Sequence, residues 1–495
     1  MPDFNPLRTP LFGYAGPVLP SLSVISPLCF TSARTLASLI ARREVSARDV
    51  MAAHLAQIER LNPQLNAIVA KRPDDACLAL AAEADERQAA GKPIGPLHGL
   101  PIAFKDLQDA RGFVTTRGSR IYRDHVSATD AVLVERLRRA GVLAIGKTNV
   151  PEFGLGSHTY NEVYGTTRNP YDTTKSAGGS SGGAGSALAA GLLPIADGSD
   201  LGGSLRNPAN FNNIVALRPS VGLVPTAPDP FPRLGFGVNG PMARSVDDVV
   251  FLLRVMAGPD PRDPGCEPMD PSALAGELGR DLRGLRVAWA PDLGGLPLDP
   301  RVRAVLDEQR HIFEALGCIV EDACPDLTAA DDIFLTIRRW RTAAVYGPLV
   351  HAHRALMKQE LLEEIDAGLA LSGNDVATAM LRHAQLLERV RRFFDGHAVL
   401  VCAVNQVPPF DAALTWPSEV AGVRMEHYVA WMRTAYWISA TFGPALSVPA
   451  GFTPDGLPVG IQIVGRFRDD WTVLQVGYAF EQATRVGERR PAISE

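Results

Sequence analysis

One lysine and two serines occupy segments whose composition could place them at a reaction centre. Lys105 ends an apolar run that begins at Gly99, Ser180 lies in a Gly/Ser-rich loop, and Ser204 closes a second Gly-rich turn that begins at Asp197. A serine hydroxyl is a weak nucleophile until a base removes its proton. A lysine can be that base when burial lowers its pKa from about 10.4. These three residues are therefore candidates for nucleophilic catalysis.

Two shorter patterns compete with this interpretation. Gly141–Thr148 matches the phosphate-loop pattern G-x-x-x-x-G-K-T, but its middle residues are Val, Leu, Ala and Ile. A phosphate loop needs a flexible backbone that curls around an anion, whereas these residues favour a strand. We predict a strand at Val142–Ile145 and no nucleotide site.

The second competing pattern is G-x-S-x-G at Gly179–Gly183, with Ser181 in the position of a hydrolase nucleophile. That elbow needs a preceding strand and a downstream Asp and His. Residues 172–178 do not have a strand pattern, and none of the ten histidines stands in an obvious catalytic loop. Ser181 is therefore the less favoured nucleophile.

A longer constellation resembles the signature of a known family. Gly178-Gly-Ser-Ser-Gly-Gly183, followed by Asp200-Leu-Gly-Gly-Ser-Leu-Arg-Asn-Pro208, is similar to the signature of the amidase signature family. Similar flanking segments are Gly99–Asp106, Gly146–Asn149 with Glu152-Phe153, Leu217–Pro219, Gly240–Arg244 and Gly456–Gly465. The similarity extends from about residue 31 to residue 490.

The resemblance implies an amidohydrolase that cleaves the C–N bond of a small amide, an aryl amide or a carbamate through an acyl-enzyme. In the family the equivalent of Ser204 attacks the carbonyl. The equivalent of Ser180 sits in a cis peptide bond and relays the proton, and the equivalent of Lys105 is the base. Neither a metal nor an organic cofactor is implied. The expected partner is a small-molecule amide.

The second Gly-rich turn also suggests how a transition state would be stabilised. Because Gly202 and Gly203 carry no Cβ, a substrate carbonyl can come close to the backbone. The N–H groups of Leu201, Gly202, Gly203 and Ser204 would then form an oxyanion hole, where one donor is typically worth about 3–4 kcal/mol. Three further residues have expected supporting roles: Ser181 as a local hydrogen-bond partner, Asp200 to orient the turn, and Arg206 to brace it by ion pairing.

Apolar periodicity shows strands alternating with helices, which favours an α/β fold. The resemblance adds a single large domain with a central mixed, mostly parallel sheet flanked by helices on both faces. We expect an irregular, proline-rich N-terminal arm at residues 1–30, an amidase signature domain at 31–495, and a signature core at about 95–225. The Pro/Gly-rich stretch Gly258–Pro271 is either a domain boundary or a long surface loop.

Composition narrows the functional classes. The 495-residue chain has a net charge of −5, which argues against a polyanion-binding protein, so we expect no nucleic-acid partner. No apolar run is long enough to span a bilayer, so we expect no membrane association. The six scattered cysteines form no CxxC pair and predict free thiols in a cytoplasmic protein. Homodimers are common in such families, although no residue pattern here indicates one.

Three questions stay open at this stage. The chain could be the amidase subunit of a tRNA-dependent amidotransferase, although the residues after Ser204 and after Gly222 do not resemble that subunit. It could also be a catalytically silent scaffold, although such relatives usually lose a member of the triad. Finally, a group of aromatic residues could line a substrate pocket or belong to the core: Phe334, Trp340, Tyr346, Phe410 and Trp416.

Overall fold

The computed structural model describes residues 26–266 and 271–495. Its α-helices are α1 (Ala33–Ala41), α2 (Ala47–Leu65), α3 (Asp74–Ala89), α4 (Val132–Arg139), α5 (Gly182–Ala189), α6 (Arg206–Phe211), α7 (Val246–Met256), α8 (Pro300–Asp307), α9 (Arg310–Ala315), α10 (Ala330–His353), α11 (Gln359–Leu369), α12 (Gly373–Gly396), α13 (Arg433–Ser439) and α14 (Asp470–Thr484). Most of the expected N-terminal arm, residues 1–25, lies outside the described residues, whereas Pro27–Phe30 forms a short 3-10 helix.

Two sheets carry the fold. The larger has eight strands in the order β10-β9-β11-β15-β14-β7-β8-β6, and the smaller has the order β1-β3-β2. The strands of the larger sheet are β6 (Ile195–Asp200), β7 (Val215–Arg218), β8 (Val238–Ala243), β9 (Arg286–Trp289), β10 (Ile319–Asp322), β11 (Val399–Ala403), β14 (Ala445–Phe452) and β15 (Pro458–Gly465). Those of the smaller sheet are β1 (Ile68–Val69), β2 (Pro101–Lys105) and β3 (Leu143–Thr148). Two strand pairs complete the set: β4 (Tyr160–Asn161) with β5 (Gly165–Thr166), and β12 (Glu419–Val420) with β13 (Val423–Arg424).

The mixed sheet confirms the expected fold class, but the expectation that it is mostly parallel is wrong. Only the β10–β9 and β9–β11 pairings of the described sheet are parallel. The pairings β11–β15, β15–β14, β14–β7, β7–β8 and β8–β6 are antiparallel. Strands β14 and β15 are joined by a short turn, which allows only an antiparallel pair. The sequence did not reveal β7, which has only four residues. It also did not reveal β8, which contains Gly240 and Pro241 where a strand usually has β-branched residues.

Alternating side chains of the large sheet enter two different cores. In β11, Val399 and Val401 belong to a core shared with α7, α8 and α14, whereas Leu400 and Cys402 belong to one shared with α10, α12 and α13. Successive side chains of a strand point to opposite faces, so helices on both sides bury both sets. The chain therefore forms one α/β domain with a helix-covered sheet.

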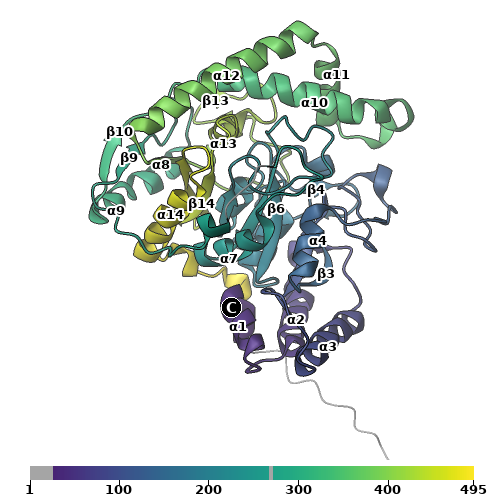
Figure 1. Cartoon of the computed structure of the whole chain (residues 1–495). Coiled ribbons are helices and arrows are strands. Elements are labelled where there is room, and N and C mark those ends of the chain that lie inside the picture. Colours follow the sequence, from purple (N-terminus) through teal and green to yellow (C-terminus); the bar gives the residue numbers. More distant parts are fainter. Residues whose placement is uncertain (1–25, 267–270) are drawn as a thin grey trace, which may run out of the picture.

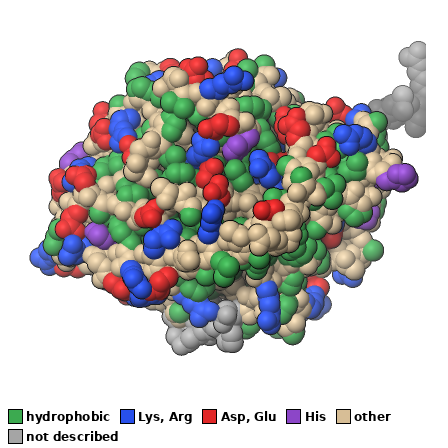
Figure 2. Space-filling view, turned by 90° about the horizontal axis from the view of Figure 1, so that it is seen from above, with side chains coloured by type: hydrophobic (Ala, Val, Ile, Leu, Met, Phe, Trp, Pro, Cys, Tyr) green, Lys and Arg blue, Asp and Glu red, His purple; other side chains and the backbone are tan. Residues whose placement is uncertain are grey.

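Figure 1 shows how the outer helices are distributed. Helices α10, α11 and α12 lie together at one end of the molecule, and α1, α2 and α3 lie at the opposite end. On the face that carries α10–α12, acidic and basic side chains are interspersed (Figure 2). No helix within residues 26–266 and 271–495 has the length and apolarity needed to cross a membrane. The described part of Gly258–Pro271 is irregular chain beside the domain core, and residues 267–270 of that stretch are not described.

Strand β3 decides between the interpretations of the phosphate-loop pattern. Leu143–Thr148 is a six-residue strand that pairs in parallel with β2. Lys147 is fully buried in this strand, and its amine donates to the Thr115 hydroxyl at 3.2 Å and lies 3.8 Å from the Asp106 carboxylate. The segment is therefore structural, as its apolar residues indicated.

Candidate active site

Lys105 lies at the carboxyl end of β2, and its amine is surrounded by oxygen atoms. The Nζ atom lies 2.9 Å from Ser180 Oγ, 2.8 Å from Ser181 Oγ and 2.9 Å from Ser199 Oγ. It also donates to the Ser199 carbonyl at 3.2 Å. The lysine side chain is fully buried. Since hydroxyls can both donate and accept, this site can hold either the neutral amine or the ammonium ion.

Three elements bring these oxygens together. Ser199 is in β6, and its side chain points to the same face as Asp197 because the two are separated by one residue. Asp197 accepts the backbone N–H of Lys105 at 3.1 Å, which fastens the end of β2 to β6. Ser180 and Ser181 precede α5, and the Gly179–Ser180 peptide bond is cis, as the resemblance implied.

The start of α5 depends on one close backbone contact. Helix α5 begins at Gly182, inside the Gly/Ser-rich segment that contains Ser180. A Cβ on Gly183 would lie 2.3 Å from the backbone nitrogen of Asn149, so only glycine fits against β3 at this position. The helix therefore starts directly after Ser181. The hydroxyl of Ser181 makes no capping bond and contacts Lys105 instead.

Burial dominates the electrostatics of Lys105. It lowers the pKa of the amine to about 7, against the opposing influence of the Asp197 and Asp200 carboxylates. Burial also raises the pKa of Asp197 to about 6, although the N–H of Lys105 and the charges of Lys147 and Lys105 act in the other direction. Desolvation disfavours the charged form of any buried group, which explains both directions.

Ser204 and Ser180 line the same cavity, which has a volume of about 280 Å³. The Ser181 N–H donates to the Ser204 carbonyl at 3.2 Å, so the two Gly-rich segments are joined through their backbones. Ser204 is 8% exposed and Ser180 is 2% exposed, so both lie just below the cavity surface. In the described residues, no hydrogen bond joins the two hydroxyls directly.

The turn from Leu201 to Ser204 presents backbone N–H groups, with one exception. The Gly203 N–H donates to Asp200 Oδ1 at 2.8 Å and is therefore already used. Within the described chain, the N–H groups of Leu201, Gly202 and Ser204 donate to no protein acceptor. Gly203 has φ of 120°, and a Cβ there would lie 2.6 Å from the Asn207 amide. The turn thus requires glycine at position 203.

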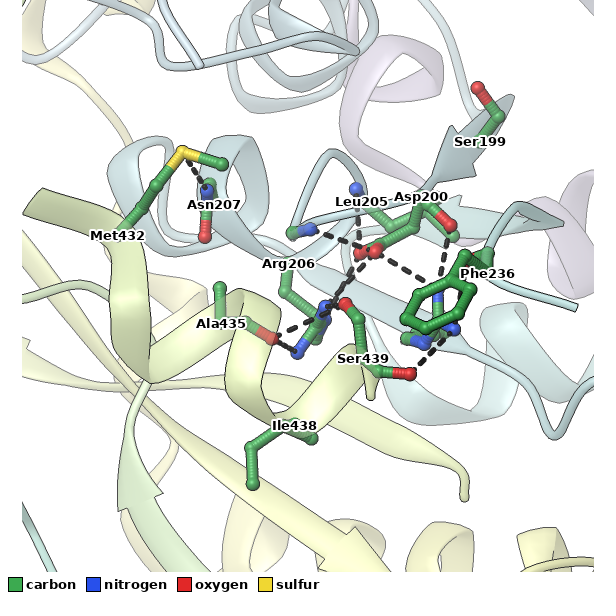
Figure 3. Close-up of polar contacts among 12 residues, drawn as sticks. Ser199, Asp200, Leu205, Arg206, Asn207, Phe236, Met432, Ala435, Ile438 and Ser439 are labelled. Atoms are coloured by element: carbon green, nitrogen blue, oxygen red, sulfur yellow. Dashed lines mark hydrogen bonds and ion pairs between the residues drawn. The ribbon is translucent and has the colours of Figure 1, made fainter. Parts of the chain in front are cut away.

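Asp200 organises this turn from below (Figure 3). Its carboxylate accepts from the N–H groups of Gly203 and Leu205, from Arg206 at 2.9 and 3.0 Å, and from Arg218 at 3.2 Å. Burial alone would raise the pKa of Asp200, but Arg206 and Arg218 outweigh it and hold the pKa well below its usual range. Asp200 is therefore a buried anion between two cations.

The expected bracing role of Arg206 has a clear geometry. Besides Asp200, its guanidinium donates to the Ala435 carbonyl at 2.8 Å, to the Ser439 hydroxyl at 2.7 Å and to the side chain of Gln462. Both Arg206 and Arg218 are fully buried. A buried guanidinium is stable only when its donors are paired, as they are here for Arg206. The Asp200 turn is thereby tied to α13 and β15.

Both apolar and charged side chains line the cavity above Ser204. The apolar ones include Leu107, Phe153, Leu155, Phe334, Val345, Tyr346, Val429 and Met432, and the charged ones are Arg117, Asp200, Asp229, Arg338 and Arg341. Of the aromatic residues whose place was open, Phe334 and Tyr346 line the cavity. Phe410 packs against Phe211 and Trp431, and Trp340 packs against Phe231. Trp416 lines a smaller neighbouring pocket.

Comparison with known proteins places this geometry in a family. The amidase family model matches residues 49–474. An acylamidase of Rhodococcus erythropolis is 36% identical over 94% of this chain and 98% of that protein. The chain belongs to the amidase signature family. A glutamyl-tRNA(Gln) amidotransferase subunit of Ralstonia nicotianae is 34% identical over 93% of this chain and 99% of that protein.

Solved structures of this family have the same fold. A bacterial aryl acylamidase of the amidase signature enzymes superposes with a TM-score of 0.86 at 28% identity, covering 94% of this chain and all of that one. A 6-aminohexanoate cyclic dimer hydrolase superposes with a TM-score of 0.83 at 26% identity, covering 95% of this chain and all of that one. The chain is accordingly a hydrolase that acts on amide C–N bonds other than peptide bonds.

Three residues of the site were missed from the sequence as functional candidates. Ser199 and Asp197 lie in a stretch that we interpreted as a turn, whereas it is the last part of β6. Side chains two residues apart in a strand point to the same face, so a strand prediction for this stretch would have placed Asp197 and Ser199 side by side. Arg218 was visible only as part of a family segment, and nothing in its local sequence pairs it with Asp200.

Further observations concern the loop after β2, the cysteines and the side chains that could bind a metal ion. Asp106 accepts from the backbone N–H of Thr116 at 3.2 Å and holds the loop after β2. All six cysteines are free thiols. Among the residues that the structure describes, no group of three or more His, Cys, Asp or Glu side chains is placed to hold a metal ion.

Proposed function

We propose that this enzyme hydrolyses amides through an acyl-enzyme on Ser204, with Ser180 as proton relay and Lys105 as base. The observation that carries the proposal is the 2.9 Å contact between the Lys105 amine and the Ser180 hydroxyl, below a cavity lined by both serines. The low pKa of Lys105, about 7, supports it, because a base must be neutral to accept a proton.

Acylation begins when substrate fills the cavity. The neutral Lys105 amine takes the proton of Ser180, Ser180 takes the proton of Ser204, and Ser204 Oγ bonds to the substrate carbonyl carbon. The carbonyl π electrons move to oxygen, which becomes an oxyanion. Because the Ser180 and Ser204 hydroxyls have no direct hydrogen bond in the described structure, the mechanism requires them to come into hydrogen-bonding contact when substrate binds. Apo sites commonly tighten in this way.

The oxyanion would be held by the free N–H groups of the turn. The N–H groups of Leu201, Gly202 and Ser204 support this role. Gly203, the fourth expected residue, supports it least, because its N–H already donates to Asp200. Each such donor typically contributes about 3–4 kcal/mol to the transition state. Asp200, Arg206 and Arg218 support the proposal by fixing the turn, so that the donors need no rearrangement.

Collapse of the intermediate needs an acid. The Lys105 ammonium returns its proton to Ser180, which protonates the leaving nitrogen as the C–N bond breaks. The amine leaves, and the acyl group stays on Ser204. A water molecule then attacks the ester while the same relay takes its proton, and the acid is released as Ser204 regains its hydrogen. The relay thus serves both half-reactions, and Ser181 and Ser199 keep the Lys105 amine in place.

We further infer that the enzyme acts as a free-standing amidohydrolase on small amides, aryl amides or carbamates. The apolar side chains of the cavity lining support an aryl or alkyl group beside the scissile bond. The second candidate is glutamine hydrolysis for an amidotransferase, which is favoured by the 34% identity to the Ralstonia nicotianae protein. A free-standing enzyme hydrolyses anilides without a partner, whereas a glutaminase component is selective for glutamine.

The test is turnover by the purified chain alone. We expect release of 4-nitroaniline from acyl 4-nitroanilides, and loss of this activity in Ser204→Ala and in Lys105→Ala. Ser186→Ala is a matched control, because Ser186 is also a buried serine but bonds to the Arg168 carbonyl at 2.9 Å outside the site. Full activity in Ser204→Ala would refute the proposed nucleophile. Release of ammonia from glutamine with no turnover of anilides would favour the second candidate.

A further inference from the structure

The charged residues that line the cavity include two arginines with unused hydrogen-bonding capacity. Arg117 follows the loop that Asp106 holds, and Arg341 lies on α10. The side chains of Arg117 and Arg341 are 35% and 23% exposed, so a molecule in the cavity can reach them. Both therefore differ from Arg206 and Arg218, which are fully buried beneath the site.

The hydrogen bonds of Arg117 and Arg341 leave several donors free. Arg117 contacts Asp109 through one terminal nitrogen at 3.3 Å, and its buried Nε has no partner. Arg341 contacts Asp229 through one terminal nitrogen at 3.1 Å. Its other donors have no acceptor among the described residues. Because the Arg117 Nε is buried, the donors that a molecule in the cavity can reach are the terminal nitrogens of both arginines.

Arg338, the third arginine of the lining, is not available in this way. It is 8% exposed and forms an ion pair with Glu364, and it also donates to the Tyr428 hydroxyl. Arg338 and Arg341 lie three residues apart on α10, so they are neighbours on one helix face. The N–H donors available to a ligand therefore come from Arg341 and Arg117, which are more exposed than Arg338.

Tyr346 completes a cluster at this end of the cavity. Burial raises the pKa of its hydroxyl, while the charges of Arg341 and Arg117 act in the opposite direction, which places both guanidinium groups within electrostatic reach of the phenol. Asp229, which also lines the cavity, pairs with Arg341, whereas the Asp200 carboxylate is used by Arg206 and Arg218. Arg117 pairs with Asp109 and Arg341 pairs with Asp229, so each guanidinium has one carboxylate partner, and what both offer to a ligand is their remaining N–H donors.

We propose that Arg117 and Arg341 form a subsite for a carboxylate carried by the amide substrate, with Tyr346 as an additional donor. The proposal rests on the proposed function, since it takes this cavity as the substrate site, and it narrows the substrate class to amides with an anionic group beside an apolar one. Guanidinium groups bind carboxylates through paired N–H donors, and the free edges of both arginines can supply them.

The test measures binding rather than turnover, so that it is independent of the chemistry at Ser204. Dissociation constants are measured for the Ser204→Ala protein with two matched pairs of anilides. Acetyl 3-carboxy-4-nitroanilide is compared with acetyl 4-nitroanilide, and succinyl 4-nitroanilide with butyryl 4-nitroanilide. The first pair places the carboxylate on the amine side of the bond and the second pair on the acyl side. We expect the anionic member of at least one pair to bind about tenfold tighter or more.

Substitutions then assign the preference to the cluster. We expect Arg117→Gln with Arg341→Gln to reduce the anion preference to below about threefold, and Asp229→Asn to increase it, since a competing carboxylate is removed. Arg382→Gln is the control, because Arg382 is an exposed α12 arginine outside the cavity and should leave the preference unchanged. A smaller anion preference in the arginine variant and a larger one in Asp229→Asn would distinguish a charge effect from a general loss of structure.

The proposal is overturned if neutral members bind as well as anionic ones in both pairs, if neither member of any pair binds, or if the preference survives the double arginine substitution. If the wild-type enzyme hydrolyses none of these anilides while the Ser204→Ala protein still binds the anionic members more tightly, the proposed chemistry is refuted and the subsite proposal is not.

Discussion

The amine of Lys105 lies 2.9 Å from the hydroxyl oxygen of Ser180, inside a ring of oxygen atoms that contains no charged group in direct contact with the amine. The nearest carboxylate partner of this residue, Asp197, binds its backbone N–H rather than its amine. This arrangement lets burial lower the proton affinity of the amine, because no carboxylate among the described residues forms a salt bridge with it.

The activity should depend on a basic group that titrates near neutral pH. Since burial lowers the pKa of Lys105 to about 7, the amine is protonated and inactive below that pH and neutral above it. We expect kcat/KM for a neutral anilide to rise through pH 7 and then level off. A profile that stays flat between about pH 6 and 9 would contradict the role of Lys105 as base.

Asp197→Asn should move this titration to lower pH. The Asp197 carboxylate raises the pKa of Lys105, so removing its charge lowers that pKa further. Asparagine still offers an oxygen to the Lys105 N–H, which isolates the effect of charge. We expect the acid limb of the kcat/KM profile to shift toward lower pH.

The control for this substitution is Asp455→Asn, because Asp455 is an exposed residue that pairs with Arg301. The acid limb of the kcat/KM profile of Asp455→Asn should coincide with that of the wild-type enzyme. A shift of the acid limb of Asp197→Asn to higher pH would contradict the expected electrostatic effect of Asp197 on Lys105.

Ser180 and Ser181 both contact the Lys105 amine, but we expect them to differ in function. Ser180→Ala removes the proton relay and should lower kcat by about a thousandfold, in the range typical of general acid–base catalysis. Ser181→Ala removes only one of the contacts that hold the amine and should lower kcat by about tenfold. If Ser181→Ala were the more damaging change in a protein of unchanged stability, the assignment of the relay would be wrong.

Arg218 should make a large contribution to the free energy of unfolding. It is fully buried and pairs with Asp200, so Arg218→Met leaves a buried carboxylate with Arg206 as its single cationic partner. Breaking a buried pair typically costs about 3–5 kcal/mol. We expect a loss of that size in the free energy of unfolding measured with urea.

An exposed ion pair provides the comparison for Arg218. Arg382→Met removes a surface contact to Asp332 and should change the free energy of unfolding by about 0.5 kcal/mol or less. If Arg218→Met cost no more than Arg382→Met, the Asp200 turn would not depend on its second arginine.

The sequence indicated Lys105, Ser180 and Ser204 as candidates, and the structure brings Lys105 into contact with Ser180 and lines one cavity with both serines. The apolar residues of Gly141–Thr148 correctly predicted a strand. The direction of the strands was not predictable in the same way, because pairing depends on contacts between distant segments. Val238–Ala243, for example, pairs with β6 despite containing Gly240 and Pro241.

Long-range pairing also explains which site residues were missed. Ser199 is significant only because β6 lies beside β2, and Arg218 only because β7 brings it under the Asp200 turn. The use of the Gly203 N–H by Asp200 is likewise a property of the folded turn. Local sequence specifies the chemistry of these residues, whereas the fold decides which of them meet.

Labelling with a fluorophosphonate probe, followed by mass mapping of the modified peptide, tests the assignment of nucleophile and base without any knowledge of the substrate. We expect one adduct on Ser204, which disappears in Ser204→Ala and is strongly reduced in Lys105→Ala. An adduct on Ser181, or labelling that is unaffected by both substitutions in folded protein, would contradict that assignment.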